Sequence, residues 1–155
     1  MKLYIGGACQ GKWKVACQEN QLKEEDSCIC GSCGKEEVFK APLLYGFHNY
    51  VKRFLFTKEE GMYFVKRLLS ENPNVVVVCN EIGCGVVPIE KREREYRELT
   101  GRILIELAKE SEQVVRVFCG IGARLKCKCC YYGMEKQKGM KNIVILGGQK
   151  KDYPS

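Results

Sequence analysis

The sequence has no long apolar run, and it contains a single histidine among its 155 residues. No apolar segment approaches the roughly 20 residues that a membrane-spanning helix needs, so we expect no membrane span. The opening residues, MKLYIGG, lack the longer apolar stretch and the small-residue cleavage site of a signal peptide. These absences predict a cytoplasmic protein.

The charged residues also lack a polybasic tail or any long block of one sign. The formal net charge is +7, from 26 basic and 19 acidic residues that are interspersed along the chain. We interpret this as a solvated surface that suits a phosphate-bearing small molecule, and we expect no nucleic-acid partner. The length is that of one ordinary domain with a single core, leaving open a homo-oligomer.

Cysteine is abundant instead, with 11 residues of this type. An odd number in a cytosolic chain disfavours a disulfide framework. Two clusters stand out: CICGSC, with Cys28, Cys30 and Cys33, and CKCC, with Cys127, Cys129 and Cys130. The first contains a pair with the C-x-x-C spacing of zinc ligands, whereas the second does not. Zinc bound by thiolates from both clusters and loose surface thiols both stay open.

The first motif is a glycine loop between a predicted strand and a predicted helix. An apolar run at 2–5 leads into IGGACQGKWK, in which Gly6, Gly11 and Lys12 fit the Gly-x-x-x-x-Gly-Lys of a phosphate-binding loop. A helix is expected to follow over 13–25. Backbone N–H groups of the loop would point at phosphate oxygens, and Lys12 would neutralise the terminal phosphates. The predicted nucleotide-binding residues are Gly6, Gly7, Ala8, Cys9, Gln10, Gly11, Lys12 and Trp13.

The rest of the chain alternates strand-type and helix-type segments. We expect a loop at 27–34, a strand within 36–45 that Pro42 interrupts or places at an edge, and an amphipathic helix at 47–55. Thr57 is a predicted N-cap for a helix to about Leu69. Further elements are expected at 75–80 (strand), 90–111 (helix) and 113–122 (strand).

This alternation predicts an α/β fold with a mostly parallel sheet flanked by helices. Ligands bind such sheets beyond the carboxyl ends of the strands. Three segments are expected to converge at that edge: the loop at Gly6, the pair Asn80–Glu81, and Gly120. We assign residues 1–126 to a nucleotide-binding domain and residues 127–155 to a Cys/Lys/Gly-rich C-terminal extension.

Three blocks resemble the adenosylcobinamide kinase / adenosylcobinamide-phosphate guanylyltransferase family of cobalamin biosynthesis. GGACQGK (6–12) is similar to its Gly-Gly-x-x-Ser-Gly-Lys-Ser opening. VVVVCNEIGCGVVP (75–88) is similar to its strand followed by Asn-Glu-x-Gly-x-Gly-x-Val-Pro, the most specific of the three. REYRELTGRI (94–103), followed by VFCGIGARLK (117–126), is similar to its helix, strand and closing Leu-Lys. The resemblance implies a P-loop NTPase-like (RecA-like) fold, GTP or ATP, Mg²⁺ and a corrinoid substrate.

The chain departs from the family pattern at several positions. Gln10 replaces the loop serine, Trp13 replaces the magnesium-binding serine, and Gly122 stands where the family has proline. The family also has a strand ending in an acidic residue, and the matching position here is Tyr45 or Gly46. An indole offers no oxygen to a metal, so packing or capping is the alternative role of Trp13 to stacking on a base or corrinoid.

The resemblance leaves two further candidate residues. Glu81 is the acidic candidate to hold Mg²⁺ through water or to accept a proton from an attacking hydroxyl, with an ion pair to an arginine as the alternative. The family guanylylates a histidine in an arginine-flanked helical motif. The single histidine here, His48, lies in YGFHNYVKR, without that pattern. A capping or surface role is its alternative, and we expect guanylyl transfer to be absent or slow.

Three functions therefore stay open from the sequence. The leading one is an enzyme that phosphorylates adenosylcobinamide with GTP or ATP and then guanylylates the product. The second is a catalytically degenerate member that binds nucleotide or corrinoid without turnover. Trp13 and the missing acidic strand end favour this second function, whereas Lys12 and Glu81 favour the first. The third is a zinc–thiolate module on a P-loop core.

Overall fold

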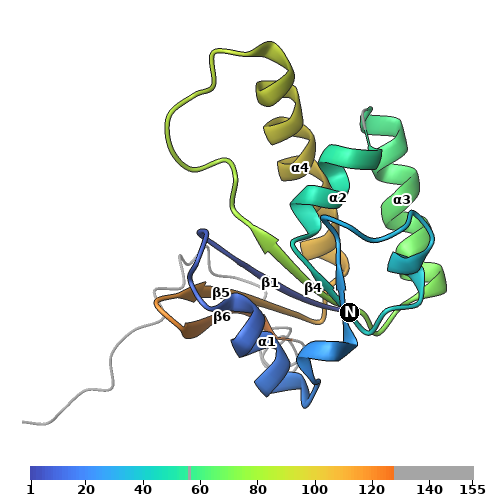
Figure 1. Ribbon diagram of the computed structural model, residues 1–155, viewed down its shortest axis with the longest axis vertical. Coiled ribbons are helices and arrows are strands. Elements are labelled where there is room, and N and C mark those ends of the chain that lie inside the picture. The colour runs from blue at the N-terminus through green and yellow to red at the C-terminus, as the bar shows by residue number, and fades with distance from the viewer. Residues whose placement is uncertain (56, 128–155) are drawn as a thin grey trace, which may run out of the picture.

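The computed structural model describes residues 1–55 and 57–127, and these form a six-stranded sheet with helices on both faces (Figure 1). The predicted α/β, P-loop NTPase-like fold class is confirmed. The predicted extension at 127–155 lies outside the described residues, apart from its first residue. The elements are β1 (Lys2–Gly6), α1 (Lys12–Asn20), η1 (Glu24–Asp26), β2 (Ser27–Ile29), η2 (Glu37–Phe39), β3 (Leu43–Tyr45), α2 (Phe47–Phe54), α3 (Lys58–Glu71), β4 (Val76–Asn80), α4 (Lys91–Glu110), β5 (Gln113–Phe118) and β6 (Ile121–Cys127).

The strands are ordered β2-β3-β4-β1-β5-β6. The first five are parallel, and β6 is antiparallel to β5. The first strand of the chain therefore lies inside the sheet, where Leu3 is paired with Val77 on one side and Val114 on the other. Parallel pairing brings the carboxyl ends of β1, β4 and β5 to one edge of the sheet.

Alternation along the buried strands divides the core into two clusters. Tyr4, Val76 and Val78 pack with α1 on one face. Val77 and Cys79 point the other way, into the larger cluster beneath α2, α3 and α4 (Figure 1). Both faces of the central strands are thus covered by helices, which explains the uninterrupted apolar run of β4.

Helix boundaries agree with the sequence where capping chemistry fixes them. Thr57 accepts a hydrogen bond from the backbone N–H of Glu60, and the Glu60 carboxylate accepts from the N–H of Thr57. This reciprocal capping box starts α3 at the predicted residue. By contrast, α1 ends at Asn20, five residues before the predicted end. Gln21 turns left-handed (φ 54°), and its N–H bonds to the carbonyls of Cys17 and Gln18.

Three strand predictions need correction. The segment at 27–34, expected as a loop, contains β2, which pairs with β3. Pro42 precedes β3 instead of interrupting it, and its carbonyl accepts from Val76 N–H (2.9 Å), so β3 is an internal strand. The strand expected to continue to Gly122 ends at Phe118. Cys119 (φ 49°) and Gly120 (φ 77°) turn the chain left-handed into β6.

Candidate nucleotide site

Two positions of the loop between β1 and α1 favour glycine, one through close approach to neighbouring backbone and the other through its left-handed conformation. A Cβ on Gly6 would lie 2.3 Å from the carbonyl oxygen of Val117, and φ there is +152°. Gly11 is the left-handed N-cap of α1 (φ 77°), and its Cβ would meet Gly120 at 3.4 Å. The close approach to β5 and to the β5–β6 turn sets the path of the loop.

Lys12 closes back over this loop. Its side chain is almost fully buried, and its ammonium donates to the Gly7 carbonyl at 2.5 Å. Burial lowers the pKa of Lys12, partly opposed by nearby Cys79, Cys9 and Glu81. The first turn of α1 holds no acidic residue and has no side-chain cap. The helix end therefore presents N–H donors and positive charge suited to an anion.

Gln10 ties the loop to the β5–β6 turn. Its side-chain oxygen accepts from the N–H of Cys119 (2.6 Å), and its carbonyl accepts from the N–H of Gly120 (3.0 Å). The sequence singled out Gln10 as a replacement for serine and as one of the predicted nucleotide-binding residues. Its bracing role was missed, because the partner lies more than a hundred residues along the chain.

Trp13 has the packing role that the sequence left as one alternative. Its indole N–H donates to the Ser27 hydroxyl (2.8 Å), and its ring stacks on Tyr45 with centroids 4.7 Å apart. The side chain thus joins the start of α1 to the start of β2 and the end of β3. Trp13, which replaces the metal-binding serine, is thus engaged with Tyr45, one of the two positions (Tyr45 or Gly46) that match the family's acidic residue.

Glu81 lies at the same edge, directly after β4. Its backbone N–H donates to the Gly6 carbonyl (2.9 Å), which joins the two strand ends. Its carboxylate accepts two bonds from Arg116, at 3.0 and 3.2 Å. The ion pair that the sequence offered as the alternative role of Glu81 is therefore present. The predicted convergence of the Gly6 loop, Asn80–Glu81 and Gly120 is confirmed.

His48 joins this edge from the first turn of α2. The half-buried ring places Nδ1 3.5 Å from the Asn80 backbone nitrogen and Nε2 3.3 Å from the Asn80 side-chain nitrogen. Burial, and next the charge of Lys12, lower the pKa of His48, so the imidazole is neutral at neutral pH. The sequence found no orienting partner for His48 nearby, because Asn80 lies 32 residues away.

The residues at this edge do not fit a magnesium site. Magnesium bound with nucleotide takes one or two protein carboxylates besides the phosphates. Here Trp13 offers no oxygen, and the carboxylate of Glu81 is engaged by Arg116. Among the described residues, groups of three or more close metal-ligand side chains occur once, and that group is Cys28, Cys33 and Glu37.

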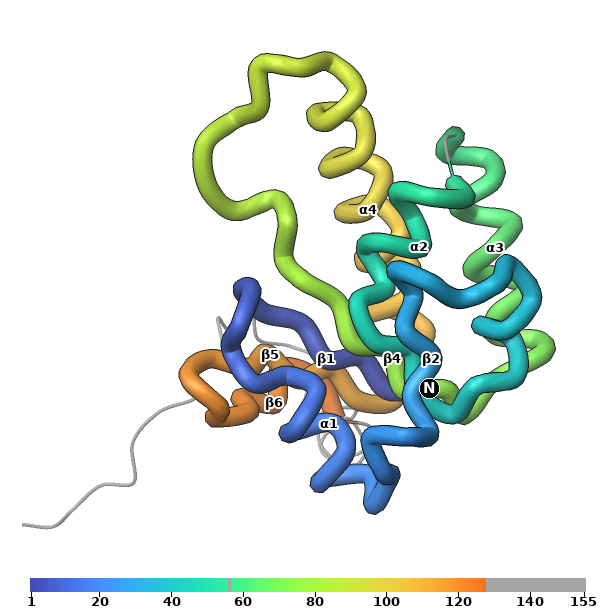
Figure 2. The backbone as a smooth tube through the Cα atoms, in the orientation of Figure 1, coloured from blue at the N-terminus to red at the C-terminus, as the bar shows by residue number. Residues whose placement is uncertain are grey.

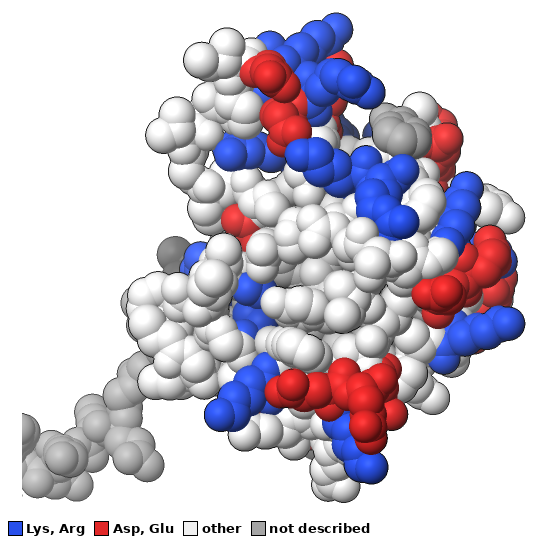
Figure 3. Space-filling view, viewed as in Figure 1, with Lys and Arg blue, Asp and Glu red and all other residues white. Residues whose placement is uncertain are grey.

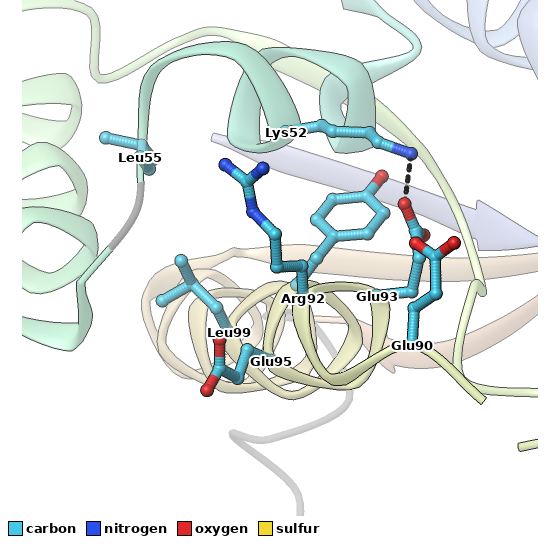
Figure 4. Close-up of a pocket in the computed structure, with 8 residues that line it drawn as sticks. Lys52, Leu55, Glu90, Arg92, Glu93, Glu95 and Leu99 are labelled. Carbon is cyan, nitrogen blue, oxygen red and sulfur yellow. Dashed lines mark hydrogen bonds and ion pairs between the residues drawn. The ribbon is translucent and has the colours of Figure 1, made fainter. Parts of the chain in front are cut away.

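A pocket of about 460 Å³ opens between α2 and α4 (Figure 4). Lys52 crosses its rim to pair with Glu93 at 2.6 Å. The Tyr96 hydroxyl, also in the lining, donates to the His48 carbonyl (2.9 Å) and so links the pocket to the backbone beneath the imidazole. The lining residues are Lys52, Leu55, Glu90, Arg92, Glu93, Glu95, Tyr96 and Leu99.

The charged side chains are dispersed, as the sequence predicted. Figure 3 shows basic and acidic residues mixed around one face, with uncharged surface over its middle. No helix within 1–55 and 57–127 has the length and apolar character needed to cross a membrane.

Comparisons with known proteins place this arrangement in a family. The family model for cobinamide kinase / cobinamide phosphate guanyltransferase matches residues 46–125, just over half of the chain. The matched region includes His48 and Asn80–Glu81 and begins after the glycine loop. The bifunctional adenosylcobalamin biosynthesis proteins CobU of Escherichia coli and Salmonella typhimurium are each 40% identical over 52 residues. That alignment covers 34% of this chain and 29% of each relative. By the extent of the family match, the chain belongs to the cobinamide kinase / cobinamide phosphate guanyltransferase family.

Proposed function

We propose that this protein acts in adenosylcobalamin biosynthesis as a nucleotide-dependent kinase that phosphorylates adenosylcobinamide. The observation that carries the proposal is the position of Lys12: a nearly buried ammonium at the uncapped start of α1, folded over the loop between β1 and α1. Family membership supplies the substrate class, since the relatives named above are adenosylcobalamin biosynthesis proteins.

In this proposal the loop binds the phosphates of GTP or ATP. Backbone N–H groups of residues 7–12 donate to phosphate oxygens, and Lys12 moves from the Gly7 carbonyl to the terminal phosphates. Gln10 holds the loop in place through Cys119 and Gly120. Glu81 is the candidate to accept the proton of the attacking hydroxyl, with Arg116 fixing its position. No step is assigned to magnesium, because the side chains here do not form its site.

Loss of Lys12 provides the test of nucleotide binding. Lys12→Ala removes the charge that meets the terminal phosphates, and we expect triphosphate binding to weaken tenfold or more, about 1.4 kcal/mol. Isothermal titration with GTP and with ATP measures this and determines the preferred nucleotide. Lys14→Ala, which removes an exposed lysine of the same helix, is the matched control. Equal affinity of Lys12→Ala and wild type would refute the phosphate-loop assignment.

Turnover separates the kinase from the catalytically degenerate alternative. The packing of Trp13 and the ion pair of Glu81 favour binding without catalysis. Transfer of labelled γ-phosphate from GTP to adenosylcobinamide, lost in Lys12→Ala, would establish the kinase. Nucleotide binding without transfer would establish the degenerate alternative.

Guanylyl transfer through His48 is a second candidate function, which the contacts with Asn80 favour. A neutral imidazole nitrogen held by a partner is the form that attacks an α-phosphate. GTP labelled at the α-phosphate should then give acid-labile label on the protein that is absent from His48→Ala. Because the pKa of His48 is lowered, labelling should persist at about pH 6, where half or more of an ordinary histidine is protonated. An unlabelled wild-type protein would restrict the function to the kinase step, as the sequence predicted.

A further inference from the structure

Three metal-binding side chains meet on the segment between β2 and η2. Cys28 lies in β2, Cys33 in the turn that follows, and Glu37 at the start of η2. Their two sulfur atoms and a carboxylate oxygen all lie within 4.8 Å of one another. Cys28 and Cys33 are free thiols. This group is separate from the proposed nucleotide-binding residues.

Backbone hydrogen bonds hold these ligand atoms in place. The N–H groups of Ser32 and Cys33 both donate to the Ile29 carbonyl, at 3.0 and 2.9 Å, which folds the chain into a tight turn. The N–H of Gly34 donates to the Glu37 carboxylate at 3.0 Å, which turns that side chain back toward the cysteines. The site is therefore largely formed before any ligand binds.

A guanidinium is bonded to the backbone of the turn that carries Cys33. Arg53 donates from one nitrogen to the carbonyls of Cys30 and Cys33, at 3.0 and 2.9 Å. Two thiolates, one carboxylate and a divalent cation have a combined charge of −1, which the charge of Arg53 offsets. Such supporting contacts around first-coordination ligands are typical of protein metal sites.

We propose that Cys28, Cys33 and Glu37 bind one Zn²⁺, with water in the fourth position. Zinc accepts mixed sulfur and oxygen ligands in tetrahedral geometry, whereas magnesium and calcium avoid sulfur. Zn–S bonds of about 2.3 Å place two sulfur atoms roughly 3.8 Å apart, a separation compatible with ligand atoms that all lie within 4.8 Å of one another. The Cys30 thiol is fully buried and stays part of the core. The bound ion joins β2 to η2, and the metal site forms whether or not nucleotide is bound.

Cobalt substitution tests the site in the full chain under reducing conditions. One equivalent of Co²⁺ should give thiolate-to-cobalt charge-transfer absorption and the visible bands of a tetrahedral site, and one equivalent of Zn²⁺ should abolish both. Cys33→Ser and Glu37→Gln should each weaken Co²⁺ and Zn²⁺ binding at least tenfold. Glu36→Gln, at a neighbouring exposed carboxylate, and Cys84→Ser, at an exposed cysteine elsewhere, should bind as wild type.

Cobalt bound by Cys129 and Cys130 of the C-terminal extension is the competing explanation for such a spectrum. Cys129→Ser/Cys130→Ser should retain the full cobalt spectrum, and loss of the spectrum in that variant would overturn the proposal. Should Cys33→Ser fail to fold by circular dichroism, Glu37→Gln decides, because its side chain is exposed and its loss leaves the core intact. Wild-type affinity in Glu37→Gln would likewise overturn the assignment.

Discussion

Glycine-bearing loops follow both β1 and β4, and the two loops differ in structure. The first, 6–11, is pressed against β5 and the β5–β6 turn, so that Gly6 has no room for a side chain. The second, 81–90, projects from the body toward the start of α4 (Figure 2). Atoms added at Gly83 or Gly85 would meet nothing within 4 Å.

The side chains at the two loops also differ in burial. Lys12, which follows the first loop, is charged and nearly buried, whereas Val86, Val87 and Ile89 of the second are apolar and 70–96% exposed. The second loop is held by its carbonyls, which accept from Arg94 and Arg97 of α4. In the first loop neighbouring atoms leave Gly6 no room for a side chain, whereas in the second the space is open and only the backbone conformation at Gly85 (φ +109°) favours glycine.

The largest effect should come from Gly6→Ala. The new methyl would overlap the carbonyl oxygen of Val117, and the positive φ disfavours any side chain, so we expect destabilisation of about 3 kcal/mol or more. Urea unfolding followed by circular dichroism measures it. Gly83→Ala is the matched change in the second loop and should stay within about 0.5 kcal/mol of wild type. Similar losses in the two variants would show that the loops do not differ as described.

A smaller effect is expected for Trp13, which anchors the helix after the first loop. Trp13→Phe keeps the stacking on Tyr45 and loses the hydrogen bond to Ser27, costing about 1 kcal/mol of unfolding free energy. Trp13→Ser loses both, and we expect a cost of about 2–3 kcal/mol.

We also expect weak magnesium dependence of nucleotide binding in the wild type. A stable Trp13→Ser protein with sharpened magnesium dependence would place Trp13 on the metal side of the site.

The smallest effect should come from the exposed side chains of the second loop. Val87 is 70% exposed, so Val87→Ser should change the free energy of unfolding by less than about 0.5 kcal/mol. The same urea titration applies. A loss above 1 kcal/mol would mean that this loop packs against the body in solution, and the contrast between the loops would fail.

Local chemistry explains which elements the sequence could predict. The amphipathic spacing of α2 and α4, the capping box at Thr57 and the apolar run of β4 are each complete within one segment. The proximity of Gly6 to Asn80–Glu81 could also be predicted, because the carboxyl ends of parallel strands lie at one edge of the sheet. These features need no knowledge of distant partners.

The elements that the sequence missed depend on distant partners. β2 has three residues and is a strand because β3 lies beside it. β6 carries no buried face of its own and is defined by its pairing with β5. In the site, the bracing by Gln10 and the contact of Asn80 with His48 each join residues from separate elements. Contacts between separate elements leave no periodic pattern in the sequence of either segment.

The central position of β1 has a consequence for the order in which the chain folds. Its partners are β4 and β5, whose residues begin more than seventy and more than a hundred positions later. During synthesis the first strand and its glycine loop therefore wait unpaired until β4 has emerged from the ribosome, and the second partner, β5, follows later still. Loops of that length close slowly, and the waiting strand is apolar. The glycine loop of the candidate site therefore precedes in the chain the strands that complete its surroundings.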